Sequence, residues 1–192
     1  MSSCRATRRA RRMPKAPPHQ LVLTGLAVLL IGNGVEANEG RAILQTPREF
    51  APFVIRQSKD YTCGAAALAN LFRFQFGQSV TEGMVLRQMA ASRSHAAIRA
   101  RGGFSFLDMA DYAATHGYLA KGEGNLSLDQ LTARLPAIIQ VDTQRDAAHF
   151  IVVLERQGEY FAVADPAKGG LLLQAEDLAA RWTGAALVLS GF

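Results

Sequence analysis

Residues Gln57-Ser-Lys-Asp-Tyr-Thr-Cys63-Gly64-Ala-Ala-Ala-Leu68 join a polar stretch to an alanine-rich run that starts at a cysteine. The run predicts a helix over Ala65–Phe76 that stops at Gly77. Cys63 would then lie at the helix N-terminus, where unpaired backbone N–H groups and a partial positive charge favour a thiolate. A thiolate attacks carbonyl carbons, and the side chain of Gln57 offers a hydrogen-bond donor for the negative oxygen that such an attack creates. This segment therefore predicts a nucleophile with an oxyanion donor.

The first 37 residues differ in kind from the rest of the chain. A basic stretch without acids is followed by the apolar run 21–31 and then by Val35-Glu36-Ala37, with short residues where a signal peptidase reads. We expect a signal peptide at 1–37, cleaved after Ala37, and an extended lead-in at 38–52. The apolar run is short for a bilayer span, which leaves an uncleaved anchor as the alternative. Translation from Met13 instead of Met1 would give a more typical leader.

The positive charge of the chain belongs to this leader. The whole chain has a formal net charge of +5, but six of its 21 basic residues and one of its 16 acidic residues precede position 38. Fifteen of each sign remain, so the mature protein is formally neutral. Nothing in its charge then indicates a nucleic-acid partner, an anionic membrane partner or stable membrane insertion. We expect a periplasmic or secreted protein.

Cys63 is the one cysteine that is expected to remain after removal of the leader. Cys4 leaves with the leader, and Cys63 is then unpaired in a compartment that oxidises thiols. Such a cysteine is either buried and inert or retained for its reactivity. One cysteine and three scattered histidines lack the spacing of a structural zinc site, so neither a metal nor another cofactor is expected.

The remaining patterns predict helices first and an antiparallel sheet afterwards, the arrangement of an α+β domain. Thr81, Ser105 and Ser127 are candidate N-caps, the last two within capping boxes. Gly158 marks a tight turn between two strands, whereas Gly102-Gly103 and Gly169-Gly170 are expected in flexible loops. The expected helices are Thr81–Ala91, Ser105–His116 and Ser127–Arg134, with a last helical turn at Ala175–Trp182, and the expected strands are Ala137–Asp142, His149–Leu154, Glu159–Ala164 and Ala185–Leu189.

A cysteine nucleophile needs a base, which is usually histidine. His95 lies in a polar stretch and is most simply a surface residue. His116 is placed at a helix end, where cation-compatible residues are common. His149 begins the most apolar strand of the chain after a polar loop, a position from which a histidine can be held rigidly and still reach a cleft. His149 is therefore the candidate base.

Asp165 is the candidate for the group that orients the imidazole. It follows the strand after His149 and precedes Pro166. If the two strands pair as a hairpin, Asp165 emerges at the same end of the sheet as His149 and can accept a hydrogen bond from its ring. The alternative interpretation is a simple turn, because Asp before Pro commonly starts one.

Taken together, these residues resemble the bacteriocin-processing peptidase family C39, whose fold is papain-like. The resemblance covers roughly residues 53–190, and it implies Cys63 as nucleophile, His149 as general base and acid, Asp165 as orienting residue and Gln57 as oxyanion donor. It is carried by Gln57…Cys63-Gly64, His149-Phe-Ile-Val-Val153, Asp165-Pro166, Gly102-Gly103-Phe-Ser-Phe-Leu-Asp-Met-Ala110 and Leu178-Ala-Ala-Arg-Trp182-Thr-Gly184.

The resemblance is to the small, stand-alone, exported members of this family, including those that accompany functional-amyloid secretion. It implies a cysteine endopeptidase that hydrolyses a peptide bond through a Cys63 thioester. Its expected partner is a peptide or a protein, such as a secreted or amyloid-forming protein or its export machinery. Two alternatives keep the fold: an acyltransferase, in which an amine intercepts the thioester, and a module that binds a secreted substrate without turnover.

Overall fold

Helix α2 (Cys63–Phe76) carries the cysteine into the centre of the domain. The computed structural model describes residues 50–91, 94–143 and 148–191, so the signal peptide and most of the lead-in predicted at 1–37 and 38–52 lie outside the described residues. The predicted helix is confirmed, although it begins two residues earlier, at Cys63. Gly77 ends it in the left-handed region, with a φ of 64°, because glycine has no Cβ to oppose that conformation.

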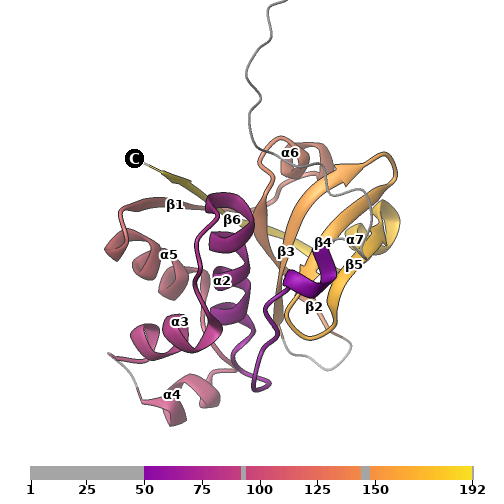
Figure 1. The fold of residues 1–192 in the computed structure, drawn as a ribbon. Helices are drawn as coiled ribbons and strands as arrows, with labels where there is room; N and C mark the ends of the chain where they lie inside the picture. Colours follow the sequence, from indigo (N-terminus) through magenta and orange to yellow (C-terminus); the bar gives the residue numbers. More distant parts are fainter. Residues whose placement is uncertain (1–49, 92–93, 144–147, 192) are drawn as a thin grey trace, which may run out of the picture. The chain divides into compact units, whose positions relative to one another are not determined.

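Short helices surround α2 and the sheet, and their starts follow the predicted caps. Thr81 accepts a hydrogen bond from the third residue of its helix, and Ser105 and Ser127 each form a complete capping box. The helices are α3 (Glu82–Met89), α4 (His95–Ala100), α5 (Phe106–Thr115), α6 (Leu128–Thr132) and α7 (Ala175–Arg181), preceded by the 3₁₀ turn η1 (Ala51–Phe53) (Figure 1). Among the described residues, no helix is long and apolar enough to cross a membrane.

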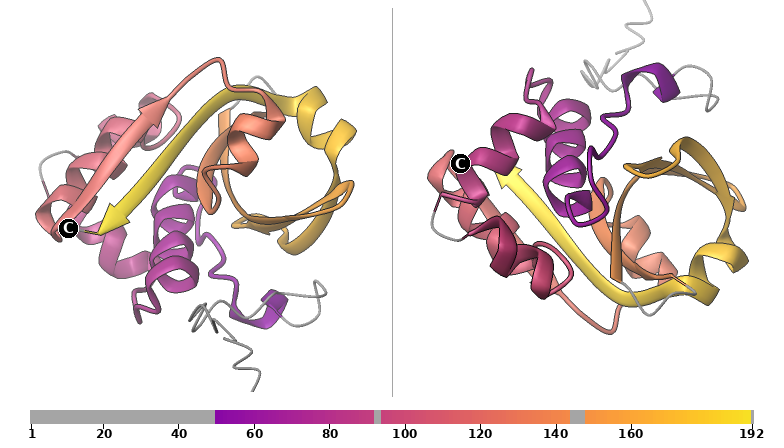
Figure 2. Two further views of the ribbon diagram at one scale, coloured as in Figure 1. Left: turned by 90° about the horizontal axis from the view of Figure 1, so that it is seen from above. Right: turned by 90° about the horizontal axis from the view of Figure 1, so that it is seen from below.

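Six antiparallel strands form one sheet in the order β1-β6-β2-β3-β4-β5. Figure 2 shows that β2 to β5 curl into an open ring, while the long strand β6 leaves the ring and runs beside β1 toward the helices. The strands are β1 (Tyr118–Glu123), β2 (Ala137–Asp142), β3 (Ala148–Gln157), β4 (Tyr160–Asp165), β5 (Gly169–Gln174) and β6 (Trp182–Gly191).

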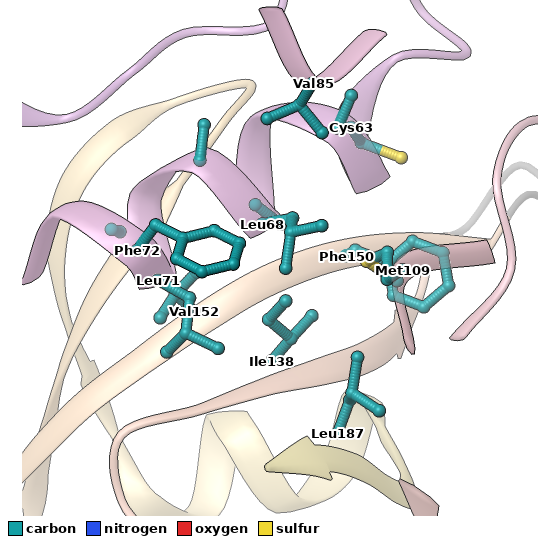
Figure 3. Packing of buried hydrophobic residues seen from close by; sticks show 14 of the residues in the cluster. Cys63, Leu68, Leu71, Phe72, Val85, Met109, Ile138, Phe150, Val152 and Leu187 are labelled. Atoms are coloured by element: carbon teal, nitrogen blue, oxygen red, sulfur yellow. The ribbon is translucent and has the colours of Figure 1, made fainter. Parts of the chain in front are cut away.

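Both faces of the curled sheet are buried, and the side chains of each strand alternate between them. Ile138, Val152 and Leu187 pack beneath α2, as Figure 3 shows. Their neighbours Ile139 and Val153 point to the other face, where they form a second cluster with α6 and α7. This double burial explains why residues 150–154 are apolar throughout, and it makes β3 a well-buried strand from which to hold His149.

Four elements were not predicted, although the α+β class is confirmed. The turn η1 lies where the end of the lead-in was expected to be extended, so that expectation is wrong for residues 51 and 52. Helix α4 lies in what the sequence indicated only as a polar stretch. Strand β1 follows the N-terminal helices and pairs with β6, so the sheet draws one strand from the helical half of the chain. The expectation of a flexible loop at Gly169-Gly170 is wrong, because both residues belong to β5. There Gly170 approaches the backbone of Ala51 so closely that a Cβ would lie 2.8 Å from the Ala51 Cα.

Candidate active site

Cys63 is the first residue of α2, and its side chain is almost fully buried, with 3 % of its surface exposed. Figure 3 shows its sulfur directed away from the core side chains Leu68 and Phe72. Thr62 occupies the N-cap position, but its hydroxyl bonds with the backbone of Lys59 instead of capping the helix. The positive end of the helix is thus left uncapped by this side chain at the residue that carries the thiol.

The hairpin β3–β4 supplies the imidazole and the carboxylate. Because its strands run antiparallel, the start of β3 lies beside the end of β4. His149 is the second residue of β3 and Asp165 the last of β4, and the His149 Nε2 lies 2.8 Å from the Asp165 Oδ1. The pairing predicted from the sequence, and the closeness that it implies, are both confirmed.

The carboxylate of Asp165 is buried, and one of its oxygens accepts several hydrogen bonds. Besides His149, its Oδ1 accepts hydrogen bonds from the backbone N–H groups of Ala167 at 2.8 Å and of Lys168 at 3.3 Å. Burial by itself would raise the pKa of Asp165, but the hydrogen bond and charge of His149, together with these N–H groups, lower it below its ordinary value. The turn expected at Asp165-Pro166 and the partner of a histidine are therefore the same structure.

The two neighbours of His149 favour the charged form of its ring. Burial opposes the charged ring and would lower the pKa of His149, but hydrogen bonds and charge from Asp165 and from Cys63 outweigh it and raise the pKa from 6.5 to about 9. The bond from Nε2 to Asp165 fixes the orientation of the ring and leaves Nδ1 for the sulfur. Cys63, His149 and Asp165 therefore form one connected row of side chains.

Gln57 lies in the segment that leads into α2, which we define as residues 54–62 and call the Gln57 segment. Its backbone N–H donates to the carbonyl of Pro166 at 3.0 Å, which places the residue against the Asp165 turn. Its side-chain Nε2 donates to the carbonyl of Lys59 at 3.0 Å, and its Oε1 has no hydrogen-bond partner among the described residues. Nε2 carries a second hydrogen, so one donor of the amide remains for another acceptor.

Arg56 is a contributor that the sequence analysis missed. Its Nε donates to the carbonyl of Pro166 at 3.1 Å, and its Nη2 donates to the carbonyl of Ala167. The guanidinium therefore fastens the Gln57 segment to the turn that holds Asp165. No spacing in the sequence signals this, since both acceptors are backbone carbonyls more than a hundred residues away.

His116 and His95 both lie at helix ends. His116 caps the end of α5, where its ring stacks on Tyr112 with centroids 4.2 Å apart and its Nδ1 lies 2.9 Å from the Tyr112 carbonyl oxygen. This is the structural role expected of a histidine at a helix end. His95 begins α4. Within residues 50–91, 94–143 and 148–191, no three His, Cys, Asp or Glu side chains are grouped as metal ligands.

Comparison with known families gives the same interpretation for nearly the whole described domain. The sequence profile of the Peptidase C39 family matches residues 53–191. The chain belongs to the peptidase C39 family. Its recognition from sequence motifs is thereby confirmed, and family membership supports a peptidase role.

Two relatives are about one third identical to this C39 chain over the aligned residues. Both are named "Probable functional amyloid protease FapD". The protein from Pseudomonas aeruginosa is 33 % identical over 162 residues, which cover 84 % of this chain and 70 % of the relative. The protein from Pseudomonas fluorescens is 32 % identical over 144 residues, which cover 75 % of this chain and 62 % of the relative. Both names agree with a peptidase role.

Solved C39 structures confirm the α+β fold. A double glycine motif protease from an AMS/PCAT transporter, crystallised in complex with the leader peptide, matches with a TM-score of 0.59 and 27 % identity, over 72 % of this chain and 91 % of that one. The peptidase domain of Streptococcus ComA matches with a TM-score of 0.60 and 20 % identity, over 72 % and 97 % of the two chains. At this identity the ComA match concerns the fold alone.

Proposed function

We propose that this C39 member is a cysteine endopeptidase that cleaves its substrate through a thioester on Cys63. The observation that carries the proposal is the row of three side chains, in which His149 is hydrogen-bonded to Asp165 at 2.8 Å and Cys63 lies close enough to raise the pKa of the ring. A thiol, an imidazole and a carboxylate in this order are the groups that acyl transfer by a cysteine requires.

The reaction follows from the protonation states. The neutral imidazole of His149 takes the thiol proton, which gives an ion pair that the raised pKa of His149 favours, and the Cys63 thiolate then attacks the carbonyl carbon of the scissile peptide bond. The C–N bond breaks as the imidazolium protonates the leaving amine, which leaves an acyl group on sulfur. His149 then removes a proton from water, which hydrolyses the thioester to a carboxylic acid and returns the thiol. The carboxylate of Asp165 keeps the ring oriented through both steps.

The negative oxygen of each tetrahedral intermediate needs donors that are already in place. We assign this role to the free N–H of the Gln57 side chain and to the backbone N–H of Cys63, which lies at the positive end of α2. Loss of one such donor lowers kcat by about 10²–10³-fold. Gln57→Ala is therefore expected to be crippled but measurable, whereas Cys63→Ala loses the covalent route altogether.

We infer a substrate of the secretion pathway. A leader at 1–37 would export the protein, and the two relatives are named amyloid proteases. A peptide or protein that is itself exported, including an amyloid-forming one, would meet this enzyme in the periplasm or outside the cell. A double glycine before the scissile bond is the specificity to test first, because the related transporter protease carries that motif in its name.

The test uses Cys63→Ala to retain the substrate and the wild-type enzyme to cut it. Purified Cys63→Ala protein is incubated with the exported protein fraction of the source cells, and the retained proteins are identified by mass spectrometry. Each is then treated with wild-type enzyme and with Cys63→Ala. Cleavage by wild type alone supports the proposal, and equal cleavage by both proteins refutes it.

Product masses, recorded with and without an added amine, separate hydrolysis from acyl transfer. Hydrolysis gives a free carboxylic acid under both conditions. A mass that grows by the amine would instead identify an acyltransferase. Retention by both proteins without any cleavage would identify a binding module.

A further inference from the structure

Asn70 is a polar side chain at the centre of an apolar helix. It lies in α2 seven residues after Cys63, and it is completely buried. Its Oδ1 accepts the backbone N–H of Ile55 at 2.7 Å, and its Nδ2 donates to the backbone carbonyl of Ile55 at 2.9 Å. The side-chain amide therefore pairs with both polar groups of one backbone residue, as a neighbouring strand would.

These two bonds join the Gln57 segment to the helix of the nucleophile. Ile55 is two residues before Gln57, and residues 54–57 form neither helix nor strand. Arg56 and Glu82 also hold this part of the segment, with Glu82 accepting the backbone N–H of Ser58 at 2.8 Å. Both of these bonds lead to elements other than α2. The described side-chain bonds thus make Asn70 the buried link between Gln57 and the helix that carries Cys63.

We propose that Asn70 is a positioning residue that sets where the Gln57 amide lies relative to the Cys63 sulfur. The inference rests on the proposed function, because it takes Gln57 to be the oxyanion donor. The physical reason is that an oxyanion donor must be placed precisely. Oxyanion donors act only within about 2.7–3.1 Å of the charge that develops, and a misplacement of roughly 1 Å costs on the order of 100-fold in rate. Without Asn70, the backbone at Ile55 loses its anchor on α2.

The experiment compares two reactions of the same sulfur. Peptide hydrolysis passes through an oxyanion, whereas alkylation of Cys63 by iodoacetamide displaces iodide and forms none. We expect Asn70→Ala to lower kcat/KM for hydrolysis by about 10–100-fold, mostly in kcat, and to leave the alkylation rate at pH 7 within about twofold of wild type. A loss that is equal in both reactions would overturn the proposal, since it would report general damage to the fold.

The control variant is Leu189→Ala, which removes a buried side chain of β6 that belongs to the same core cluster. It lowers the melting temperature through a cavity and removes none of the hydrogen bonds described for Ile55 or Gln57, which go to other residues. We expect it to change neither reaction by more than about twofold while the protein stays folded. If it lowers hydrolysis as selectively as Asn70→Ala does, loss of stability explains both variants and the proposal fails. Asn70→Ser replaces Asn70→Ala if the latter does not fold.

A double variant tests whether Asn70 acts through Gln57. In the Gln57→Ala background, Asn70→Ala should cost less than about threefold more in kcat/KM, because the donor that it positions is already gone. Full additivity of the two losses would overturn the proposal.

Hydrogen exchange separates a failure of the inference from a failure of the proposed function. The amides of Ile55 and Gln57 are hydrogen-bonded to Asn70 and Pro166 in the wild type. In Asn70→Ala, we expect both to lose protection while residues 66–72 of α2 keep theirs. Unchanged protection at both amides would refute the positioning role, even for an enzyme without hydrolytic activity. If Asn70→Ala loses protection at both amides but the wild-type protein cuts nothing, only the peptidase assignment is refuted.

Discussion

The β3–β4 hairpin and the Gln57 segment hold their functional groups in different ways. Residues 150–154 of the hairpin are buried on both faces of the sheet. The pairing of β3 with its neighbour β2 continues as far as His149. The Gln57 segment has no ladder, and its residues 58–60 are exposed. It depends on single side chains: Asn70, Arg56 and Glu82. The proposed acid–base pair is thus held redundantly, whereas the proposed oxyanion donor depends on a few bonds that can be removed one at a time.

The largest expected effect is on the hairpin side, where Asp165→Asn removes the carboxylate but keeps the size of the side chain. We expect kcat/KM to fall by about 10³–10⁴-fold, because the ring loses its fixed orientation and the charge that stabilises the imidazolium. Circular dichroism and melting should show that the hairpin remains folded. Asp177→Asn, at an exposed position in α7, is the matched control. A loss below tenfold would contradict the orienting role.

Arg56 links the two regions, and its loss should therefore affect both reactions of the sulfur. We expect Arg56→Ala to lower hydrolysis by roughly 10–30-fold and to slow alkylation as well, in contrast to Asn70→Ala. Arg56→Lys keeps the charge but cannot donate to two carbonyls in the same fork, so it should recover only part of the activity. Wild-type activity in Arg56→Lys would show that charge, rather than the paired donors, is what matters.

The pH profile reports on His149, which the hairpin carries. The pKa of His149 is raised to about 9, so the imidazolium that protonates the leaving amine is present below that pH and is lost above it. We expect kcat/KM of the wild type to fall with an alkaline limb near pH 9. Asp165→Asn removes the partner that raises this pKa, so the corresponding step in the pH profile of alkylation should move to lower pH. If this step does not move, the charge of Asp165 does not raise the pKa of His149.

The smallest effect on the hydrolysis rate is expected for a substitution of Gly103, which packs against Tyr61 of the Gln57 segment. Its φ is +130°, and a Cβ there would lie 2.9 Å from the carbonyl oxygen of Tyr61. Gly103→Ala should reduce the free energy of unfolding by about 1–3 kcal/mol, measured by urea denaturation. Gly122→Ala is the matched control, because a Cβ at Gly122 meets nothing within 4 Å. Equal stability of the two variants would show that residues 61 and 103 can move apart freely.

Local signals in the sequence predicted much of this architecture. Ser105 and Ser127 indicate helix starts because their side chains accept a hydrogen bond from the backbone N–H of the third helical residue. Gly77 indicates the end of α2 because glycine readily adopts the left-handed conformation. The positions of His149 and Asp165 followed from one further assumption, that consecutive strands pair as a hairpin. These features depend on neighbours that are close in sequence or on a common pairing rule.

The missed features depend on partners that are distant in sequence. Strand β1 contains Lys121, Gly122 and Glu123, which do not favour a strand by themselves, and it becomes one by pairing with β6. Gly169-Gly170 suggested a flexible loop, although Gly170 lies where the backbone of Ala51 leaves no room for a larger residue. Asn70 did carry a signal, since an asparagine on an otherwise apolar helix face needs a hydrogen-bond partner, but the identity of that partner was not readable.

The burial of α2 bears on how such an enzyme can change over evolutionary time. All ten residues from Cys63 to Phe72 are buried, so the first part of the helix has no surface on which substitutions are nearly neutral. A lineage that acquires a new substrate cannot easily do so by altering this helix. Its variation would be confined to the exposed border of the site, where residues such as Lys59 and Asp60 can change without disturbing the core. The sulfur stays fixed while the surface around it adapts.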